Sequence, residues 1–144
     1  MNKPAGKFCF AAARARRALC AALLCGCLCL GLAGCGASLP EGVTQDDVTQ
    51  AAAATVAALN SRDYDVLTAS MNETMTAALD KEKLAAAWEP FSEKMGAFSS
   101  IAKTRVGASK GYAVAVVTAD YAAGTVTFTL SYDADLKLAG LYFK

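Results

Sequence analysis

The hydrophobic and polar positions divide the chain into three stretches. Residues 18–34 carry no charge and are almost all apolar or small. Between residues 44 and 96, apolar side chains such as Val48 and Ala52 recur three or four positions apart, as on one face of a helix. After residue 96, β-branched and aromatic side chains alternate with polar ones, which is typical of half-buried strands. The pattern therefore predicts an apolar leader, a helical half and a sheet half.

The first helix of the helical half is predicted to begin at Thr44. Asp47 lies three positions later, so the two residues can form a reciprocal capping box. The polar run at residues 60–63 breaks the helical pattern. Two short helical stretches are expected after it, near residues 63–70 and 73–79.

A second long helix is predicted to begin at Asp80, whose carboxylate can cap it, and to run through Trp88. Pro90 has no N–H to donate and disfavours helical geometry before it, so a kink or a restart is expected there. Gly96 is a suitable residue to end this helix.

The sheet half contains four candidate strands in an antiparallel meander, at residues 97–106, 111–121, 125–133 and 136–143. Helices followed by hairpins predict an α+β fold in which the N-terminal helices pack on one face of a curled four-stranded antiparallel sheet.

The clearest alternation lies in the third strand, where four side chains form an apolar face: Val126, Phe128, Leu130 and Tyr132. A three-residue loop at residues 122–124 places Thr118 opposite Phe128. The same apolar face then receives four more residues of the second strand, Tyr112, Val114, Val116 and Asp120. A three-residue loop at residues 133–135 adds Leu136, Leu138, Gly140 and Tyr142, with Gly140 leaving room for the Phe128 ring. A loop one residue longer or shorter reverses these facings.

The charges separate the leader from the rest of the chain. The whole chain is 55% hydrophobic with a net charge of +1, but all charged residues before Cys35 are basic. From Cys35 onward, nine basic residues face thirteen acidic ones, so this part is mildly acidic. It has no basic patch with interleaved aromatic residues, and nucleic acid is therefore not an expected partner.

The leader ends in Leu32, Ala33, Gly34 and Cys35, a run that resembles the lipobox of bacterial lipoproteins. The resemblance implies that Cys35 receives a diacylglycerol and that cleavage occurs before it. The expected domains are a signal peptide at residues 1–34, a lipidated Cys with its tether at 35–43, and one folded domain at 44–144. The expected location is the outer face of the bacterial cytoplasmic membrane. An uncleaved transmembrane helix and ordinary secretion are the alternatives.

The remaining cysteines offer no metal site. Cys25, Cys27 and Cys29 lie inside the apolar run, where thiols behave as small hydrophobic side chains. Their spacing also differs from the usual paired ligands of structural zinc sites. We expect neither a metal nor a cofactor.

Three short motifs in the folded part suggest a family. They are Asp63-Tyr64-Asp65, Trp88 with Gly96-Ala97-Phe98, and the ending Lys137-Leu138-Ala139-Gly140-Leu141. With them, the segment from Asp47 to Lys144 resembles the nuclear-transport-factor-2-like superfamily, which has a cystatin-like fold. Within it, the segment is similar to a bacterial family of unknown function, found alone in lipoproteins or ahead of α/β-hydrolase domains. The resemblance implies a cone-shaped roll with a pocket between helices and sheet, and no particular activity.

Six side chains are candidates to line such a pocket for a small apolar ligand: Trp88, Tyr112, Asp120, Phe128, Tyr132 and Tyr142. The alternative is that the aromatic residues among them simply fill the core. A carboxylate at Asp120 on an apolar face could act with a tyrosine hydroxyl as a general acid/base pair.

The run Gly107-Ala108-Ser109-Lys110-Gly111 matches the letters of a nucleophile elbow, which requires a strand, a strained turn and a helix. Here the run joins two predicted strands, and the chain contains no histidine for a catalytic triad. We therefore interpret it as a hairpin turn and expect no catalytic residue in it.

Three functional hypotheses follow. The first is a non-catalytic module that binds a small ligand or an envelope protein, and the second is a small acid/base enzyme using Asp120. The third is an accessory subunit of an exported hydrolase or cell-wall enzyme. The resemblance also implies a homodimer, because members of this fold often pair through one face of the sheet, and the alternative is that this face is simply exposed to solvent. The face is weakly polar and is made of Thr125, Thr127, Thr129, Ser131, Ala113 and Ala115.

Overall fold

The structure is a computed structural model that describes residues 38–144. The predicted signal peptide at residues 1–34, its lipobox and Cys35 lie outside the described residues. In the described part, four helices precede a four-stranded antiparallel sheet, which confirms the predicted α+β fold. No helix within residues 38–144 is long and apolar enough to cross a membrane.

The first described helix, α2 (Gln45–Ser61), begins as predicted. The Thr44 hydroxyl accepts a hydrogen bond from the Asp47 backbone N–H at 3.2 Å, and the Asp47 carboxylate accepts one from the Thr44 N–H at 3.0 Å. This reciprocal pair satisfies two N–H groups that the helix leaves free at its start.

Three further helices follow, α3 (Tyr64–Ala69), α4 (Glu73–Ala78) and α5 (Lys81–Met95). Side chains cap all three, because Asp63, Asn72 and Asp80 each accept a hydrogen bond from the backbone N–H three residues later. Of the kink and the restart expected at Pro90, the restart is wrong, since α5 continues through this residue. Proline costs the helix one N–H donor there, and the packing of the buried Leu84 and Trp88 on the same helix offsets that loss.

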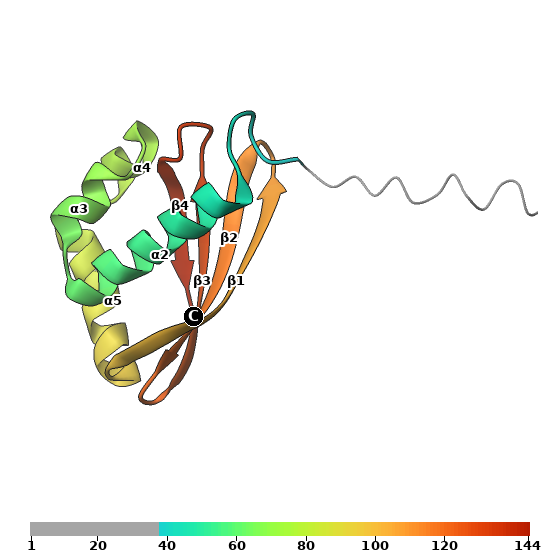
Figure 1. Ribbon diagram of the computed structural model, residues 1–144. Coiled ribbons are helices and arrows are strands. Elements are labelled where there is room, and N and C mark those ends of the chain that lie inside the picture. The colour runs from blue at the N-terminus through green and yellow to red at the C-terminus, as the bar shows by residue number, and fades with distance from the viewer. Residues whose placement is uncertain (1–37) are drawn as a thin grey trace, which may run out of the picture. The chain divides into compact units, whose positions relative to one another are not determined.

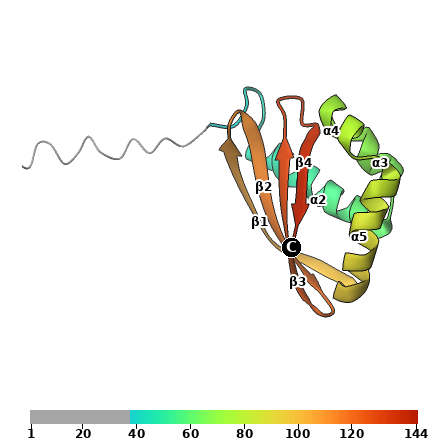
Figure 2. The same cartoon turned by 180° about the vertical axis from the view of Figure 1, so that it is seen from behind.

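The strands are β1 (Phe98–Ser109), β2 (Tyr112–Tyr121), β3 (Gly124–Tyr132) and β4 (Leu138–Phe143), and they pair in sequence order. Figure 1 shows α2 crossing one face of this open sheet, with α3, α4 and α5 beside it. Figure 2 shows the opposite face turned towards the viewer, with α2 behind the strands. We call this opposite face the outer sheet face.

The predicted register of β2 against β3 is wrong. Tyr121 pairs with Gly124, so the turn contains only Ala122 and Ala123, and Phe128 lies opposite Val117 instead of Thr118. One residue fewer in the turn reverses every facing in β2. Its buried side chains are Ala113, Ala115, Val117, Ala119 and Tyr121. The residues expected on that face therefore lie on the outer sheet face, namely Tyr112, Val114, Val116, Thr118 and Asp120.

The facing of β4 is corrected in part. Leu138 is buried as predicted, but the ladder shifts between the Ser131 and Tyr132 pairs. Gly140 therefore lies opposite Ser131, and Tyr142 is on the outer sheet face. A Cβ at Gly140 would lie 3.4 Å from the Ser131 Cβ, so this glycine makes no room for Phe128.

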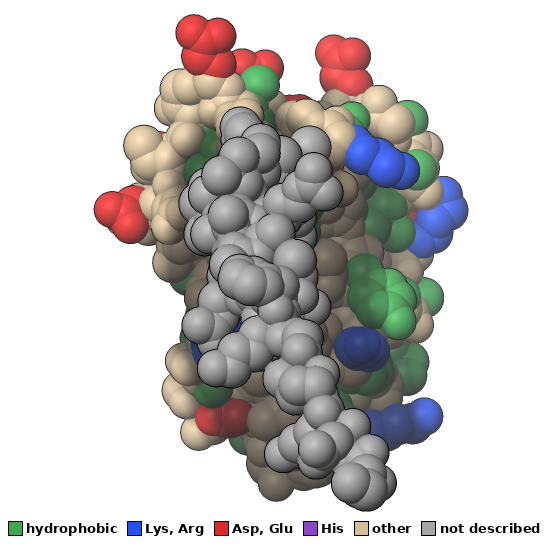
Figure 3. All heavy atoms as spheres, turned by 90° about the vertical axis from the view of Figure 1, so that its right-hand side faces the viewer, with side chains coloured by type: hydrophobic (Ala, Val, Ile, Leu, Met, Phe, Trp, Pro, Cys, Tyr) green, Lys and Arg blue, Asp and Glu red, His purple; other side chains and the backbone are tan. Residues whose placement is uncertain are grey.

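The outer sheet face carries the predicted threonines of β3. From β2, however, it carries valines and not the expected alanines. Ala113 and Ala115 are buried in the core, whereas Val114 and Val116 point outward with Thr129. In Figure 3, basic side chains lie mainly on the right of the view, which is the side facing the viewer in Figure 2, and acidic ones lie mainly at the top and left. The surface that we expected to be weakly polar is therefore also charged.

We expect alkaline pH to destabilise this fold through Tyr132. Its side chain is buried, and its hydroxyl lies 2.8 Å from Thr55 Oγ1. Burial raises the pKa of Tyr132 to about 12, above the value of about 10 for an unfolded tyrosine. The unfolded chain therefore loses this proton first as pH rises, so stability present below pH ~10 falls by about 2–3 kcal/mol towards pH ~12.

Urea unfolding across this pH range measures that loss. Tyr132→Phe has no proton to release, so its unfolding free energy should fall less steeply with pH than that of the unchanged protein. Equal slopes for the two proteins would assign the effect to other groups, such as Tyr121, whose pKa burial also raises.

Candidate functional site

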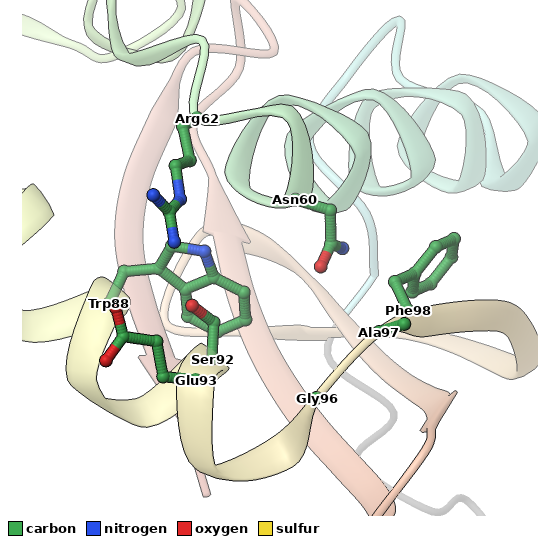
Figure 4. Close-up of a pocket in the computed structure, with 8 residues that line it drawn as sticks. All are labelled: Asn60, Arg62, Trp88, Ser92, Glu93, Gly96, Ala97 and Phe98. Atoms are coloured by element: carbon green, nitrogen blue, oxygen red, sulfur yellow. The ribbon is translucent and has the colours of Figure 1, made fainter.

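A surface hollow of about 280 Å³ opens at one end of the domain. It lies where the end of α2, the second half of α5 and the start of β1 meet (Figure 4). We call it the rim hollow, and the residues that line it are Asn60, Arg62, Trp88, Ser92, Glu93, Gly96, Ala97 and Phe98. Its volume lies just below the usual range of small-ligand pockets, about 300–1,000 Å³.

The ends of the two long helices give the rim hollow its shape. Arg62 caps α2 in the left-handed conformation, with φ of 57°, and its N–H bonds to the carbonyls of Ala58 and Leu59. Gly96 ends α5 with φ of 73°, and a Cβ there would lie 3.1 Å from the Ala122 Cβ. This position therefore requires glycine, and the close approach places the end of α5 directly against the turn between β2 and β3.

One wall of the hollow is fixed by hydrogen bonds. The Asn60 amide donates to the Val56 carbonyl at 2.8 Å, and its oxygen accepts from the Tyr121 hydroxyl at 2.9 Å. Burial raises the pKa of Tyr121, so this hydroxyl stays protonated at neutral pH and remains a donor. Asn60 therefore acts as a rigid part of the wall.

The charged groups of the hollow come from opposite sides. Arg62 reaches from the end of α2 towards Trp88, and Glu93 lies on α5 (Figure 4). Among residues 38–144, Arg62 forms no salt bridge. A guanidinium can bind a carboxylate through two parallel hydrogen bonds, and Glu93 can accept from an ammonium group. The hollow therefore suits a small molecule that carries a carboxylate and an ammonium group beside an apolar group.

Three of the six predicted pocket residues lie in the core, where Trp88 packs against Phe128 while Tyr132 contacts Thr55 of α2. Trp88, Phe128 and Tyr132 are at most 2% exposed. The Trp88 ring lies 5.6 Å from that of Phe128 and 5.1 Å from that of Phe143, measured between centroids. Aromatic rings thus fill the space between α5 and the sheet where the resemblance implied a pocket.

The other three, Tyr112, Asp120 and Tyr142, lie on the outer sheet face and do not join the first three. The acid/base hypothesis assumed that Asp120 shares the apolar face with Phe128. That assumption is wrong, because the two side chains point to opposite faces of the sheet.

The elbow-like run forms the hairpin turn that we expected. Ser109 ends β1, and Lys110 and Gly111 turn the chain with positive φ of 53° and 84°. Within residues 38–144, no cluster of three or more His, Cys, Asp or Glu side chains could hold a metal ion.

Of the residues that line the rim hollow, only Trp88 was predicted from the sequence as a pocket residue. Sequence reasoning identified residues 60–63 as a break and Gly96 as a helix stop, but treated both as connectors. The available signal was an arginine and an asparagine at one helix end, with an aromatic residue, Phe98, directly after the other. Only the fold shows that the two helix ends meet.

Comparisons with known proteins agree with the fold and give no activity. Residues 52–141 match the model of a family described as "Protein of unknown function (DUF3887)". Among solved structures, the chain is similar to one described as "NMR structure of protein from Ruminococcus gnavus ATCC 29149", with 22% identity and a TM-score of 0.59. That match covers 74% of this chain and 96% of the other, and at this identity it shows the fold alone. A search of curated proteins finds no match.

Proposed function

This chain belongs to the family of proteins of unknown function DUF3887, and we propose that it is a lipid-anchored, non-catalytic binding module. In this proposal, Cys35 carries the lipid and the folded part is a nuclear-transport-factor-2-like domain. The ligand enters the rim hollow and is either a small molecule or the end of a partner chain. It has a carboxylate beside an apolar group.

The observation that carries the proposal is the position of Arg62. Its backbone is held in a left-handed cap, its side chain points towards Trp88, and it has no salt-bridge partner among the described residues. Arg62 is exposed, and its guanidinium, unpaired among these residues, can form two parallel hydrogen bonds to a carboxylate. Phe98, which is 39% exposed at the same hollow, offers apolar contact.

The filled interior supports a surface site over an internal one. Trp88 packs against Phe91, Phe128 and Phe143, so a ligand between α5 and the sheet would have to displace core rings. Displacing them costs several kcal/mol, as large core changes do. Binding at the rim requires no such change.

Titration of residues 38–144 with three probes, followed by amide NMR signals, tests the proposal. The probes are phenylalanine, phenylacetate and phenethylamine, which share a ring and differ in charge. Phenylalanine and phenylacetate should shift the signals of Arg62, Gly96 and Phe98, whereas phenethylamine should have a much smaller effect.

The variant Arg62→Gln should weaken phenylacetate binding roughly tenfold or more, because a hydrogen bond to a charged group contributes about 1.5–3 kcal/mol. The matched control is Lys94→Gln, which removes one positive charge outside the hollow. Equal binding to both variants would reject Arg62 as the recognition group.

A further inference from the structure

The outer sheet face presents three exposed basic side chains. Lys103 pairs with Thr118, and Arg105 pairs with Val116, so both point to this face. Lys144 extends the sheet beside β3, because it exchanges two backbone hydrogen bonds with Thr127, at 3.0 and 3.1 Å. The three cations lie on both edges of the face, with threonine hydroxyls between them.

The two layers of the domain carry opposite charge. Residues 44–96, which form the helices, contain nine acidic and four basic residues. Residues 98–132 and 138–144, which form the sheet, contain four basic residues and one acidic residue, Asp120. Basic side chains accordingly lie on the sheet side in Figure 3. Such a separation orients a domain in the field of a charged surface.

Two tyrosines add amphipathic rings to the same face. Tyr112 is 42% exposed and Tyr142 is 59% exposed, and both point outward. Tyrosine is favoured where an apolar environment meets water, because its ring is apolar and its hydroxyl is polar. The face therefore combines basic groups with the aromatic residue type that is common at membrane surfaces.

We propose that the outer sheet face docks on the anionic headgroups of a phospholipid membrane. Basic residues near an anionic membrane are attracted to it, while the acidic helices turn away. The same charges disfavour a homodimer through this face, because two copies would place six basic side chains against two acidic ones.

The position of Cys35 in the chain agrees with this orientation, an argument that rests on the proposed lipid anchor at this residue. Leu39 already packs against the core. Only two residues lie between Cys35 and Ser38, so the three chain steps span about 11 Å at most. The first described residues lie at the end of the sheet where β1 turns into β2 (Figures 1 and 2). An anchor at Cys35 would therefore hold the sheet close to the membrane.

Vesicle sedimentation with residues 38–144 tests docking without the lipid anchor, so failure of one proposal does not affect the other. The fragment is suitable because the solved relative consists almost entirely of this domain, 96% of that chain being covered, and is folded in solution. Vesicles of phosphatidylcholine with phosphatidylglycerol should bind the domain, and vesicles of phosphatidylcholine alone should not. Added salt should weaken binding, because it screens exposed charges.

The decisive variant is Lys103→Gln with Arg105→Gln, which should weaken binding roughly 10- to 30-fold. The matched control, Lys83→Gln with Lys94→Gln, removes two charges from the helical layer and should bind as the unchanged domain does. Circular dichroism on the same samples establishes that each variant is folded.

Three outcomes would overturn the proposal. The first is no binding to anionic vesicles by the folded domain, which would leave Lys103 and Arg105 as charges that protect an edge strand from aggregation. The second is an equal loss of binding in both double variants. The third is a concentration-dependent dimer, measured by sedimentation, that Thr129→Arg dissociates.

Discussion

Replacing Trp88 by alanine is expected to lower the free energy of unfolding by about 3–5 kcal/mol, the usual cost of removing a large aromatic side chain from a core. Trp88 is 1% exposed. Its ring lies within 6.4 Å of four other aromatic rings, from Phe91, Tyr121, Phe128 and Phe143. The cavity left by alanine would remove all of these contacts together.

Urea unfolding measures this change, with two variants for comparison. Trp88→Phe keeps a ring in the core and should lose less stability than Trp88→Ala. Tyr142→Ala removes an aromatic side chain that is 59% exposed, and should change stability by about 0.5 kcal/mol or less. Similar small losses for Trp88→Ala and Tyr142→Ala would mean that the interior is not filled as described, and would reopen an internal pocket.

Replacing Cys35 by alanine is expected to abolish attachment of lipid to the protein. The sulfur of Cys35 is the proposed site of the diacylglycerol, and lipid-dependent cleavage between Gly34 and Cys35 should also stop. Stable anchoring depends on the acyl chains, since each buried methylene contributes about 0.8 kcal/mol. The expected result is an unlabelled, uncleaved precursor after growth with labelled palmitate.

The matched control is Cys29→Ala, which removes a thiol from the same apolar run and should leave labelling and cleavage intact. Intact mass of the membrane-extracted protein gives the second readout, because cleavage removes residues 1–34. A full-length mass for the unchanged protein would favour the uncleaved transmembrane helix. Palmitate labelling that persists in Cys35→Ala would reject Cys35 as the lipidated residue.

The helices were predictable because their signals are local. Thr44 with Asp47 and Asp80 with its helix are capping patterns readable within four residues, and the structure contains both. At Pro90 a kink or a restart was expected, and the restart is wrong because packing of the buried Trp88 and Leu84 outweighs the loss of one backbone hydrogen bond.

The register of the sheet was harder, because β2 is apolar on both faces. Its inward residues include Ala115 and Val117, and its outward residues include Val114 and Val116, so hydrophobicity alone does not separate them. The polar Thr118 and Asp120 lie on the same face as Val114 and Val116, and their polarity would have assigned this face to the outside. The expected three-residue turn outweighed this signal and reversed the strand.

The rim hollow was not predictable from the chain. Asn60 and Arg62 lie about thirty residues before Ser92 and Glu93, and nothing in either segment indicates that the two helix ends meet. The basic outer sheet face was not predictable for the same reason. Lys103, Arg105 and Lys144 share a surface only because β1 to β4 pair in one sheet.

The most direct test of the binding account is to locate bound phenylacetate by intermolecular NMR contacts in residues 38–144. The account predicts contacts from the probe ring to Phe98, which lines the rim hollow, and their loss in Arg62→Gln. Contacts to Val66 and Leu136, which lie at a separate crevice beside α2, would contradict it. So would contacts to Phe98 that persist unchanged in Arg62→Gln, because binding would then not depend on the guanidinium.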